Sequence, residues 1–158
     1  MRNVVLTRID DRLIHGQVVT GWVKKTDCSR ILVIDDQVAK DVFMQRLLKA
    51  AAPPKIPVEA KSTEEASRWL LEEETAGERI MILVKVPQVI EIMQKAGIIF
   101  DEVILGGMAS KAGRKKFNKN VSASEEEVEC MKRIMGRGTK ILFQLVPDEN
   151  PVDVAKLV

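Results

Sequence analysis

The sequence has few of the features that mark disulfide-bonded, metal-binding or membrane-spanning proteins. Its two cysteines, Cys28 and Cys130, lie far apart and match neither a C-x-x-C nor a zinc-type spacing. We therefore expect two reduced thiols in a cytoplasmic protein. No apolar run approaches the ~20 residues that a bilayer crossing requires. Charged residues recur between Arg2 and Arg12, which is atypical of a signal peptide. Any role at a membrane would therefore act through a partner.

Charge and glycine patterns argue against two further classes. The net charge of +2 is too small to indicate general nucleic-acid binding. Neither G-x-G-x-x-G nor G-x-x-x-x-G-K occurs, so a dinucleotide site or a P-loop is not supported. Repeats, linkers and low-complexity segments are also missing, and 158 residues are enough to bury a full core. We expect a single domain over residues 1–158.

What the sequence does contain is an alternation of apolar runs with stretches of helical spacing. The apolar runs predict strands at residues 4–9, 31–34, 58–60, 80–84, 103–105, 117–121 and 140–146. Between them, spacings such as Met44, Leu47, Leu48 and Ala51 mark one face of a helix. The alternation predicts an α/β fold: a single-domain, open, doubly wound sheet, mostly parallel, with helices on both faces. Ligands of such sheets gather at the carboxyl ends of the strands.

The richest polar group in the chain surrounds its single histidine, His15. Imidazole is a good nucleophile near neutral pH, because its ordinary pKa is ~6.5. It can accept a phosphoryl group, whose transferring oxygens Arg8 and Arg12 can stabilise. Asp10 or Asp11 can orient the imidazole or hold an arginine in place. We assign these five residues to a catalytic site for phosphoryl transfer.

Backbone N–H groups can complete such an anion site. Gly16 lets the backbone approach closely at the start of a helix, where free N–H groups and the helix dipole attract anions. Gly106 and Gly107 follow a later strand and would let further N–H groups reach the same anion. We assign Gly16, Gln17, Gly106 and Gly107 to the phosphate loops.

Each of these assignments has a structural alternative that the residues alone leave open. His15 can be a histidine with a structural hydrogen bond, and Asp10-Asp11 can cap a helix. A metal at the paired carboxylates is less favoured, because the adjacent arginines already supply counter-charge. Gly106-Gly107 also fits a tight turn with positive φ. The basic stretch fits either a solvated face or a docking patch for acidic, phosphate-carrying partners; it comprises Lys111, Arg114, Lys115, Lys116 and Lys119.

The run Arg8-Ile9-Asp10-Asp11-Arg12-Leu13-Ile14-His15-Gly16-Gln17-Val18 resembles the active-site signature of a known family. That family is the IIB component of the mannose/fructose/sorbose type in the bacterial phosphoenolpyruvate-dependent sugar phosphotransferase system. Ile104-Leu105-Gly106-Gly107-Met108 is similar to its second recurrent stretch, and the length and element order also fit. The resemblance therefore covers nearly the whole chain.

The resemblance implies a phosphotransferase that carries a phosphoryl group on His15, at Nδ1 of the ring. The donor would be a phosphohistidine of a IIA partner, and the final acceptor a sugar entering through membrane IIC and IID components. The resemblance implies no organic cofactor and no metal. It further implies a free-standing, cytoplasmic IIB that associates peripherally with the permease.

Two other functions remain as competing hypotheses. Acidic residues after the first strand and Lys85 after a later one are similar to a receiver-type signalling site, in which an aspartate is phosphorylated beside Mg²⁺. Arg8, Arg12 and His15 crowd the place where that cation would sit, which disfavours this hypothesis. The third hypothesis is a binding module without catalysis, in which the basic stretch holds an acidic partner.

Overall fold

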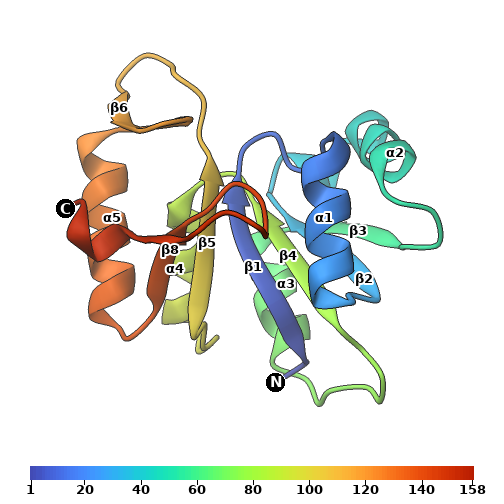
Figure 1. Cartoon of the computed structure of the whole chain (residues 1–158). Helices are drawn as coiled ribbons and strands as arrows, with labels where there is room; N and C mark the ends of the chain where they lie inside the picture. The colour runs from blue at the N-terminus through green and yellow to red at the C-terminus, as the bar shows by residue number, and fades with distance from the viewer.

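The computed structural model describes the backbone of residues 1–158 and every side chain except that of Gln17. Seven strands form one sheet in the order β3-β2-β4-β1-β5-β8-β9 (Figure 1). Neighbouring strands are parallel except for the last pair, β8 and β9, which is antiparallel. The strands are β1 (Val4–Asp10), β2 (Arg30–Ile34), β3 (Val58–Lys61), β4 (Ile80–Val84), β5 (Glu102–Gly107), β8 (Lys140–Phe143) and β9 (Val152–Asp153). The predicted open, mostly parallel sheet is confirmed.

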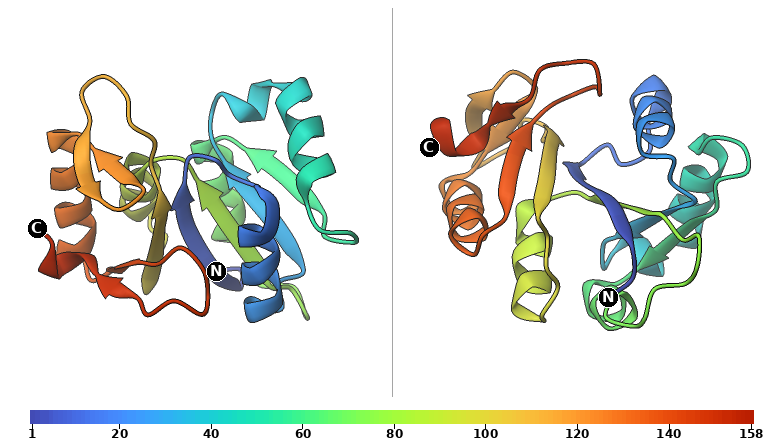
Figure 2. Two further views of the ribbon diagram at one scale, coloured as in Figure 1. Left: turned by 45° about the horizontal axis from the view of Figure 1, so that its top comes forward. Right: turned by 60° about the horizontal axis from the view of Figure 1, so that its bottom comes forward.

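Helices cover both faces of this sheet, also as predicted (Figure 2). They are α1 (Gly16–Thr26), α2 (Val42–Ala51), α3 (Thr63–Leu70), α4 (Pro87–Lys95) and α5 (Glu125–Gly136), with short 3-10 segments η1 (Val38–Lys40) and η2 (Val154–Lys156). α1 and α2 pack on one face and α3, α4 and α5 on the other, each face with its own apolar cluster. Because helices cover both faces, all five residues of β4 are buried. Each helix in the described chain falls short of the length and apolar character that a membrane crossing requires.

The order of the strands creates one special point along the carboxyl edge. After β1 the chain crosses to the face of α1, whereas after β5 it crosses to the face of α5. β1 and β5 are neighbours, and Asp10 at the end of β1 lies opposite Gly107 at the end of β5. Doubly wound sheets open a crevice where the crossover direction reverses, and their ligands bind there. The topology therefore points to the same residues as the sequence motif.

Two strand predictions are wrong in detail. The strand expected at residues 117–121 is a hairpin of β6 (Lys115–Asn118) and β7 (Val121–Ala123), which pair outside the main sheet. Lys119 adopts a φ of 33° between them, so a tight turn splits the expected strand. The strand expected at residues 140–146 ends at Phe143. Beyond it, the Gln144 amide donates to the carbonyl oxygens of Pro147 and Glu149, which turns the chain back into β9.

α2 also packs differently from the expectation. Leu48 is buried, but Leu47, expected on the same buried face, is 49% exposed. α2 contacts η1 and β3, and β3 is the edge strand of the sheet. The helix therefore has sheet beneath only part of its surface, which leaves apolar side chains uncovered.

Candidate active site

His15 occupies the junction between β1 and α1. It is the residue that caps the N-terminus of α1, with φ −146° and ψ 118°. Leu13 and Gly16 on either side adopt positive φ values of 56° and 45°. The Leu13 N–H donates to the Asp10 carbonyl at 2.9 Å, and the Leu13 and Ile14 side chains are buried. This anchored turn presents the imidazole at the carboxyl edge with 24% of its side chain exposed. The predicted strand-to-helix position of His15 is confirmed, and Gly16 supplies a backbone conformation that favours glycine.

The two imidazole nitrogens have different surroundings. Nδ1 lies 3.1 Å from the carbonyl oxygen of Leu13, so in the neutral ring this nitrogen carries the proton and donates it. Nε2 is buried, lies 3.9 Å from Asp10 Oδ2 and has no hydrogen-bond partner among the described side chains. The ring is thus set between a carbonyl oxygen on one side and a carboxylate on the other.

Asp10 is the centre of the charged cluster. Its fully buried carboxylate accepts from Arg8 Nη2 at 3.2 Å, and from Arg12 Nε and Nη2 at 2.9 and 2.8 Å. The backbone N–H of Arg12 donates to it as well, at 3.1 Å. Hydrogen bonding to Asp10 raises the pKa of Arg12. Two guanidinium groups share one carboxylate, so the cluster keeps a positive excess beside the imidazole.

Arg8 and Arg12 hold different places in this cluster. The Arg12 side chain is 44% exposed, and its Nη2 lies 2.8 Å from Asp10 Oδ2, the oxygen that lies 3.9 Å from His15 Nε2. The Arg8 side chain is 1% exposed; its Nη1 donates to the Gln144 carbonyl at 2.9 Å and its Cζ lies 5.4 Å from the centre of the Trp22 ring. Burial lowers the pKa of Arg8, and the adjacent Asp10 opposes that shift. Arg8 therefore lies beneath Asp10 and supports it from the protein interior.

Gly106 and Gly107 are needed for a reason that the sequence did not suggest. Both belong to β5, and neither has a positive φ, so the alternative of a tight turn with positive φ is wrong. A Cβ at Gly106 would overlap the guanidinium of Arg8. A Cβ at Gly107 would lie 2.9 Å from Arg12 Nη2 and 3.2 Å from Asp10 Oδ1. The two glycines thus leave room for the arginines, and whether their N–H groups also reach a phosphoryl group stays a prediction.

Comparison with known proteins agrees with this geometry. The family described as "PTS system sorbose subfamily IIB component" matches residues 4–158. The mannose-specific EIIAB component of Escherichia coli (strain K12) is 36% identical over 97% of this chain. The fructose-specific EIIB component of Bacillus subtilis (strain 168) is 30% identical over 100% of this chain and 97% of its own length. The IIBSor domain of the Klebsiella pneumoniae sorbose permease superposes with a TM-score of 0.93 at 31% identity, covering 98% of this chain and 95% of that one.

The chain is a IIB component of this sorbose subfamily. It spans about half the length, 47%, of the E. coli mannose-specific relative, and nearly the full length of the B. subtilis fructose-specific one. The family resemblance that the sequence motif indicated is therefore confirmed, as is the fold that it implied.

In this IIB component the Asp11 side chain links the loop after β1 to the loop after β5. Asp11 Oδ2 accepts from the Ala109 N–H at 2.7 Å and from Arg114 Nη1 at 3.4 Å. Arg114 also donates two hydrogen bonds to Glu127, at 2.8 and 3.0 Å, and Glu127 belongs to the capping box of α5. The Arg114 side chain is 2% exposed, so it does not belong to a solvated basic face. Asp11 does hold an arginine, as one of its two predicted roles required, but that arginine is Arg114.

The remaining predicted residues fall into two groups. The side chain of Gln17 lies outside the described part of the IIB component, so its place in a phosphate loop is an open prediction. Lys85, the residue that suggested a receiver-type site, lies 4.0 Å from Asp35 rather than beside Asp10. Because the oxygens of Asp10 already accept from two arginines, the acidic pair does not offer a metal the open carboxylates that it prefers.

Sequence reasoning missed the residues that support the cluster from a distance. Gln144 contacts Arg8 through its backbone carbonyl, 136 residues along the chain, and Trp22 places a ring beside the same guanidinium. A carbonyl oxygen has no residue-type signal, so the sequence could not identify Gln144. The sequence partly indicated the contact between Arg114 and α5. Arg114 precedes Glu127, the glutamate of a capping box, and a hairpin between them can bring the two side chains together.

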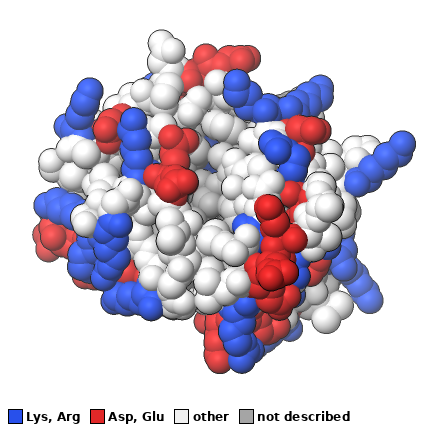
Figure 3. All heavy atoms as spheres, turned by 90° about the horizontal axis from the view of Figure 1, so that it is seen from below, with Lys and Arg blue, Asp and Glu red and all other residues white. Residues whose placement is uncertain are grey.

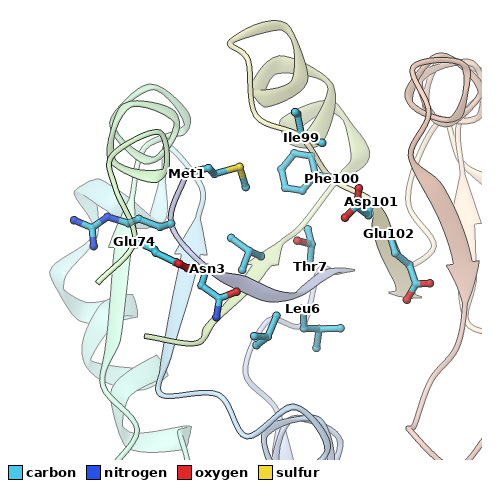
Figure 4. A pocket seen from close by; sticks show the side chains of 12 residues that line it. Met1, Asn3, Leu6, Thr7, Glu74, Ile99, Phe100, Asp101 and Glu102 are labelled. Carbon is cyan, nitrogen blue, oxygen red and sulfur yellow. The ribbon is translucent and has the colours of Figure 1, made fainter. Parts of the chain in front are cut away.

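A hollow of about 510 Å³ lies at the opposite, amino-terminal edge of the sheet. The first residues of β1 line it together with Phe100, Asp101 and Glu102 (Figure 4). Seen from below, this edge shows acidic and basic side chains mixed around a largely uncharged centre (Figure 3). The hollow is at the far end of β1 from His15, and its carboxylates would repel a phosphoryl group. We therefore place the active site of the IIB component at the carboxyl edge.

Proposed function

We propose that this chain is the phosphocarrier of a sugar phosphotransferase system. His15 takes a phosphoryl group from the phosphohistidine of a IIA domain and gives it to a sugar during uptake through membrane IIC and IID components. The carrier works on the cytoplasmic side and associates peripherally with the permease. The observation that carries this proposal is the imidazole of His15 at the reversal point of the sheet, beside a buried carboxylate shared by two arginines.

The transfer to His15 is a displacement at phosphorus. A lone pair of the imidazole forms the new N–P bond while the N–P bond to the donor imidazole breaks, and the donor ring keeps the electron pair of that bond. Negative charge spreads over the three equatorial oxygens, which a positioned cation stabilises. Arg12 is placed for this role, because Asp10 holds its Nε and Nη2 and its side chain borders solvent. N–H groups in the first turn of α1 add to the attraction.

Asp10 has a second role when the ring is phosphorylated. A neutral imidazole that attacks through one nitrogen becomes a cation, with its proton on the other nitrogen. The family resemblance implies attack through Nδ1, in which case Nε2 carries the proton and faces Asp10 Oδ2 at 3.9 Å. The carboxylate then stabilises the cationic, phosphorylated ring. For this the proton must first pass from Nδ1 to Nε2 by exchange with solvent, and the ring must release the contact between Nδ1 and the Leu13 carbonyl, which is 3.1 Å long in the unphosphorylated protein.

The proposal is tested by the chemistry of the label. The protein is incubated with radiolabelled phosphoenolpyruvate, the general carrier proteins and a IIA domain, and the protein-bound phosphate is then challenged. We expect an acid-labile, base-stable label at His15, as a phosphohistidine requires. A base-labile, hydroxylamine-sensitive label would indicate an acyl phosphate on an aspartate and would overturn the proposal. No label on this chain, with the IIA domain labelled, would favour a binding module without catalysis.

A further inference from the structure

α2 exposes apolar side chains that the fold does not use. Val42 is 61% exposed, Phe43 is 68% exposed and Leu47 is 49% exposed, whereas Leu48 is the buried leucine of the same helix. Phe43 and Leu47 lie one helical turn apart, so their side chains are neighbours on the surface. Contiguous apolar patches of this kind mark interaction sites more often than isolated exposed residues do. We call these three residues the α2 patch.

The α2 patch lies at the same edge of the sheet as His15. β1 and β2 both run parallel to β4, so their carboxyl ends share one edge. His15 caps α1 after β1, and Asp41 caps α2 shortly after β2, so both helices begin at this edge. Both helices also pack on the same face, side by side in Figures 1 and 2. Val42 and Phe43, in the first turn of α2, therefore border the surface that a partner must cover to reach His15.

The charged side chains within α1 and α2 are all basic. α1 and α2 contain lysine and arginine but no aspartate or glutamate, whereas the first turns of α3 and α5 are acidic. Arg46 and Lys49, on α2 itself, have no carboxylate within 4.0 Å among the described side chains. The nearby carboxylates lie before the first turn of α2 and accept backbone N–H groups: Asp41 that of Met44, Asp35 that of Val38 and Asp36 that of Thr63. The patch thus has an apolar centre, with Arg46 and Lys49 as a cationic rim along α2 and Asp41 at its N-terminal end.

This charge pattern favours some binding partners of the α2 patch over others. A second copy of the chain, docked through the same patch by a two-fold axis, would bring two α2 helices together, each with basic and no acidic residues, which is repulsive. A phosphoryl donor brings negative charge in its phosphohistidine, and an acidic surface around it would complement the cationic rim. Relay partners that must separate after each transfer have small interfaces, for which a few apolar anchors supply most of the binding energy.

We propose that the α2 patch is the docking anchor for the phosphoryl-donor IIA domain, with Arg46 and Lys49 as its electrostatic rim. The inference rests on the proposed function of the chain and adds the surface through which the donor binds. Val42, Phe43 and Leu47 supply affinity, and the cluster around His15 supplies the chemistry. Loss of the patch should therefore change the concentration dependence of transfer and not its maximal rate.

The test measures transfer from the IIA domain to His15 separately from transfer from His15 to the sugar. Phosphorylated IIA domain is mixed with increasing concentrations of the wild-type chain or of the double variant Phe43→Ser/Leu47→Ser, and the label on His15 is followed. We expect the KM for this chain to rise at least tenfold with kcat within a factor of two. Ile92→Ser on α4 is the matched control, since Ile92 is 53% exposed on the opposite face of the sheet and should leave KM unchanged. Circular dichroism checks the fold of both variants.

The second half-reaction distinguishes the occupants. Both proteins are phosphorylated at saturating donor and then mixed with sugar and membrane vesicles that contain the permease, where we expect rates within a factor of two. A defect in this step alone would assign the patch to the membrane partner and overturn the inference. An unchanged KM with donor would also overturn it, including when the variant loses self-association in sedimentation. Failure of the proposed function would look different, because the wild-type chain itself would then carry no label.

Discussion

A buried carboxylate is shared by two arginines at several places in the described structure, and two of these clusters differ in what surrounds them. At the carboxyl edge, Asp10 binds Arg8 and Arg12. Between α4 and α5, Glu91 binds Arg133 at 2.7 Å and Arg137 at 3.1 Å. Both acids are nearly inaccessible, at 0% and 10% side-chain exposure. The ion pairs by themselves therefore do not distinguish a site from a structural link.

The residues beside each cluster distinguish a reactive site from a structural link. Beside Glu91 lies Cys130, whose Sγ is 3.6 Å from Glu91 Oε1 and whose pKa burial raises to about 12, so the thiol is unreactive near neutral pH. Arg133 and Arg137 extend into solvent and join α4 to α5. Beside Asp10 lies an imidazole, and Arg8 is enclosed by Gly106 and Trp22. A carboxylate between two arginines thus serves packing in one place and, on our proposal, phosphoryl transfer in the other.

The largest difference between the two clusters should appear when the imidazole of His15 is removed. We predict that His15→Ala abolishes phosphorylation by the donor, because His15 is the single histidine of the chain and a phosphohistidine cannot form without it. The protein should remain folded, since His15 makes one hydrogen bond and is partly exposed. The measurement is label incorporation with the melting temperature as a control. Normal incorporation by His15→Ala would place the acceptor on another residue.

The next largest effect is expected from a single methyl group at Gly106. Gly106→Ala forces its Cβ into the guanidinium of Arg8, which is buried and cannot move aside cheaply. We predict a loss of ~1–3 kcal/mol in the free energy of unfolding, as overpacking of a core typically costs. Transfer should slow by more than tenfold, because Arg8 would shift Asp10 and with it Arg12.

Gly136 provides the matched control for this substitution. A Cβ there meets nothing within 4 Å, and its φ is not positive. Gly136→Ala in α5 should therefore leave transfer unchanged and stabilise the helix by up to ~1 kcal/mol. Denaturant unfolding and transfer kinetics measured on both variants check the contrast. If the two variants had the same unfolding free energy and the same transfer rate, Gly106 would not be needed to leave room for Arg8.

Truncation of one arginine in each cluster compares their roles directly. Arg12→Ala should slow transfer by more than tenfold, since loss of one positioned charge at a transferring group costs ~3 kcal/mol. Arg137→Ala should leave the rate within a factor of two, because Arg137 contacts Glu91 and lies away from His15. Single-turnover labelling at saturating donor measures both rates. An unchanged rate for Arg12→Ala would remove Arg12 from the mechanism.

These comparisons also show which parts of the protein the sequence could predict. The strand and helix order followed from local patterns, because apolar runs such as Ile80–Val84 are buried on both faces wherever they lie in such a sheet. His15, Arg12 and Asp10 are near neighbours in sequence, so a local motif could bring them together. The reason for Gly106 could not be predicted, since it depends on the path of the Arg8 side chain across a strand pairing. The buried position of Arg114 could not be predicted for the same reason, because its partners Asp11 and Glu127 come from other parts of the chain. A run of basic residues, taken by itself, predicts a solvent-exposed face.

The smallest predicted effect concerns the acid stability that the second cluster provides. Hydrogen bonds from Arg133 lower the pKa of Glu91 from 4.5 to about 2. A carboxylate whose pKa is lower in the folded state stabilises that state above its unfolded pKa, and the stabilisation is lost as the pH falls through the folded value. The wild-type protein should therefore lose this contribution between about pH 4.5 and about pH 2. Glu91→Gln lacks the contribution at every pH, so its melting temperature should be lower at pH 7 and should approach that of the wild-type protein on acidification. Its transfer rate at pH 7 should match the wild-type rate, whereas a comparable loss of transfer would show that the α4–α5 cluster is coupled to the site at His15.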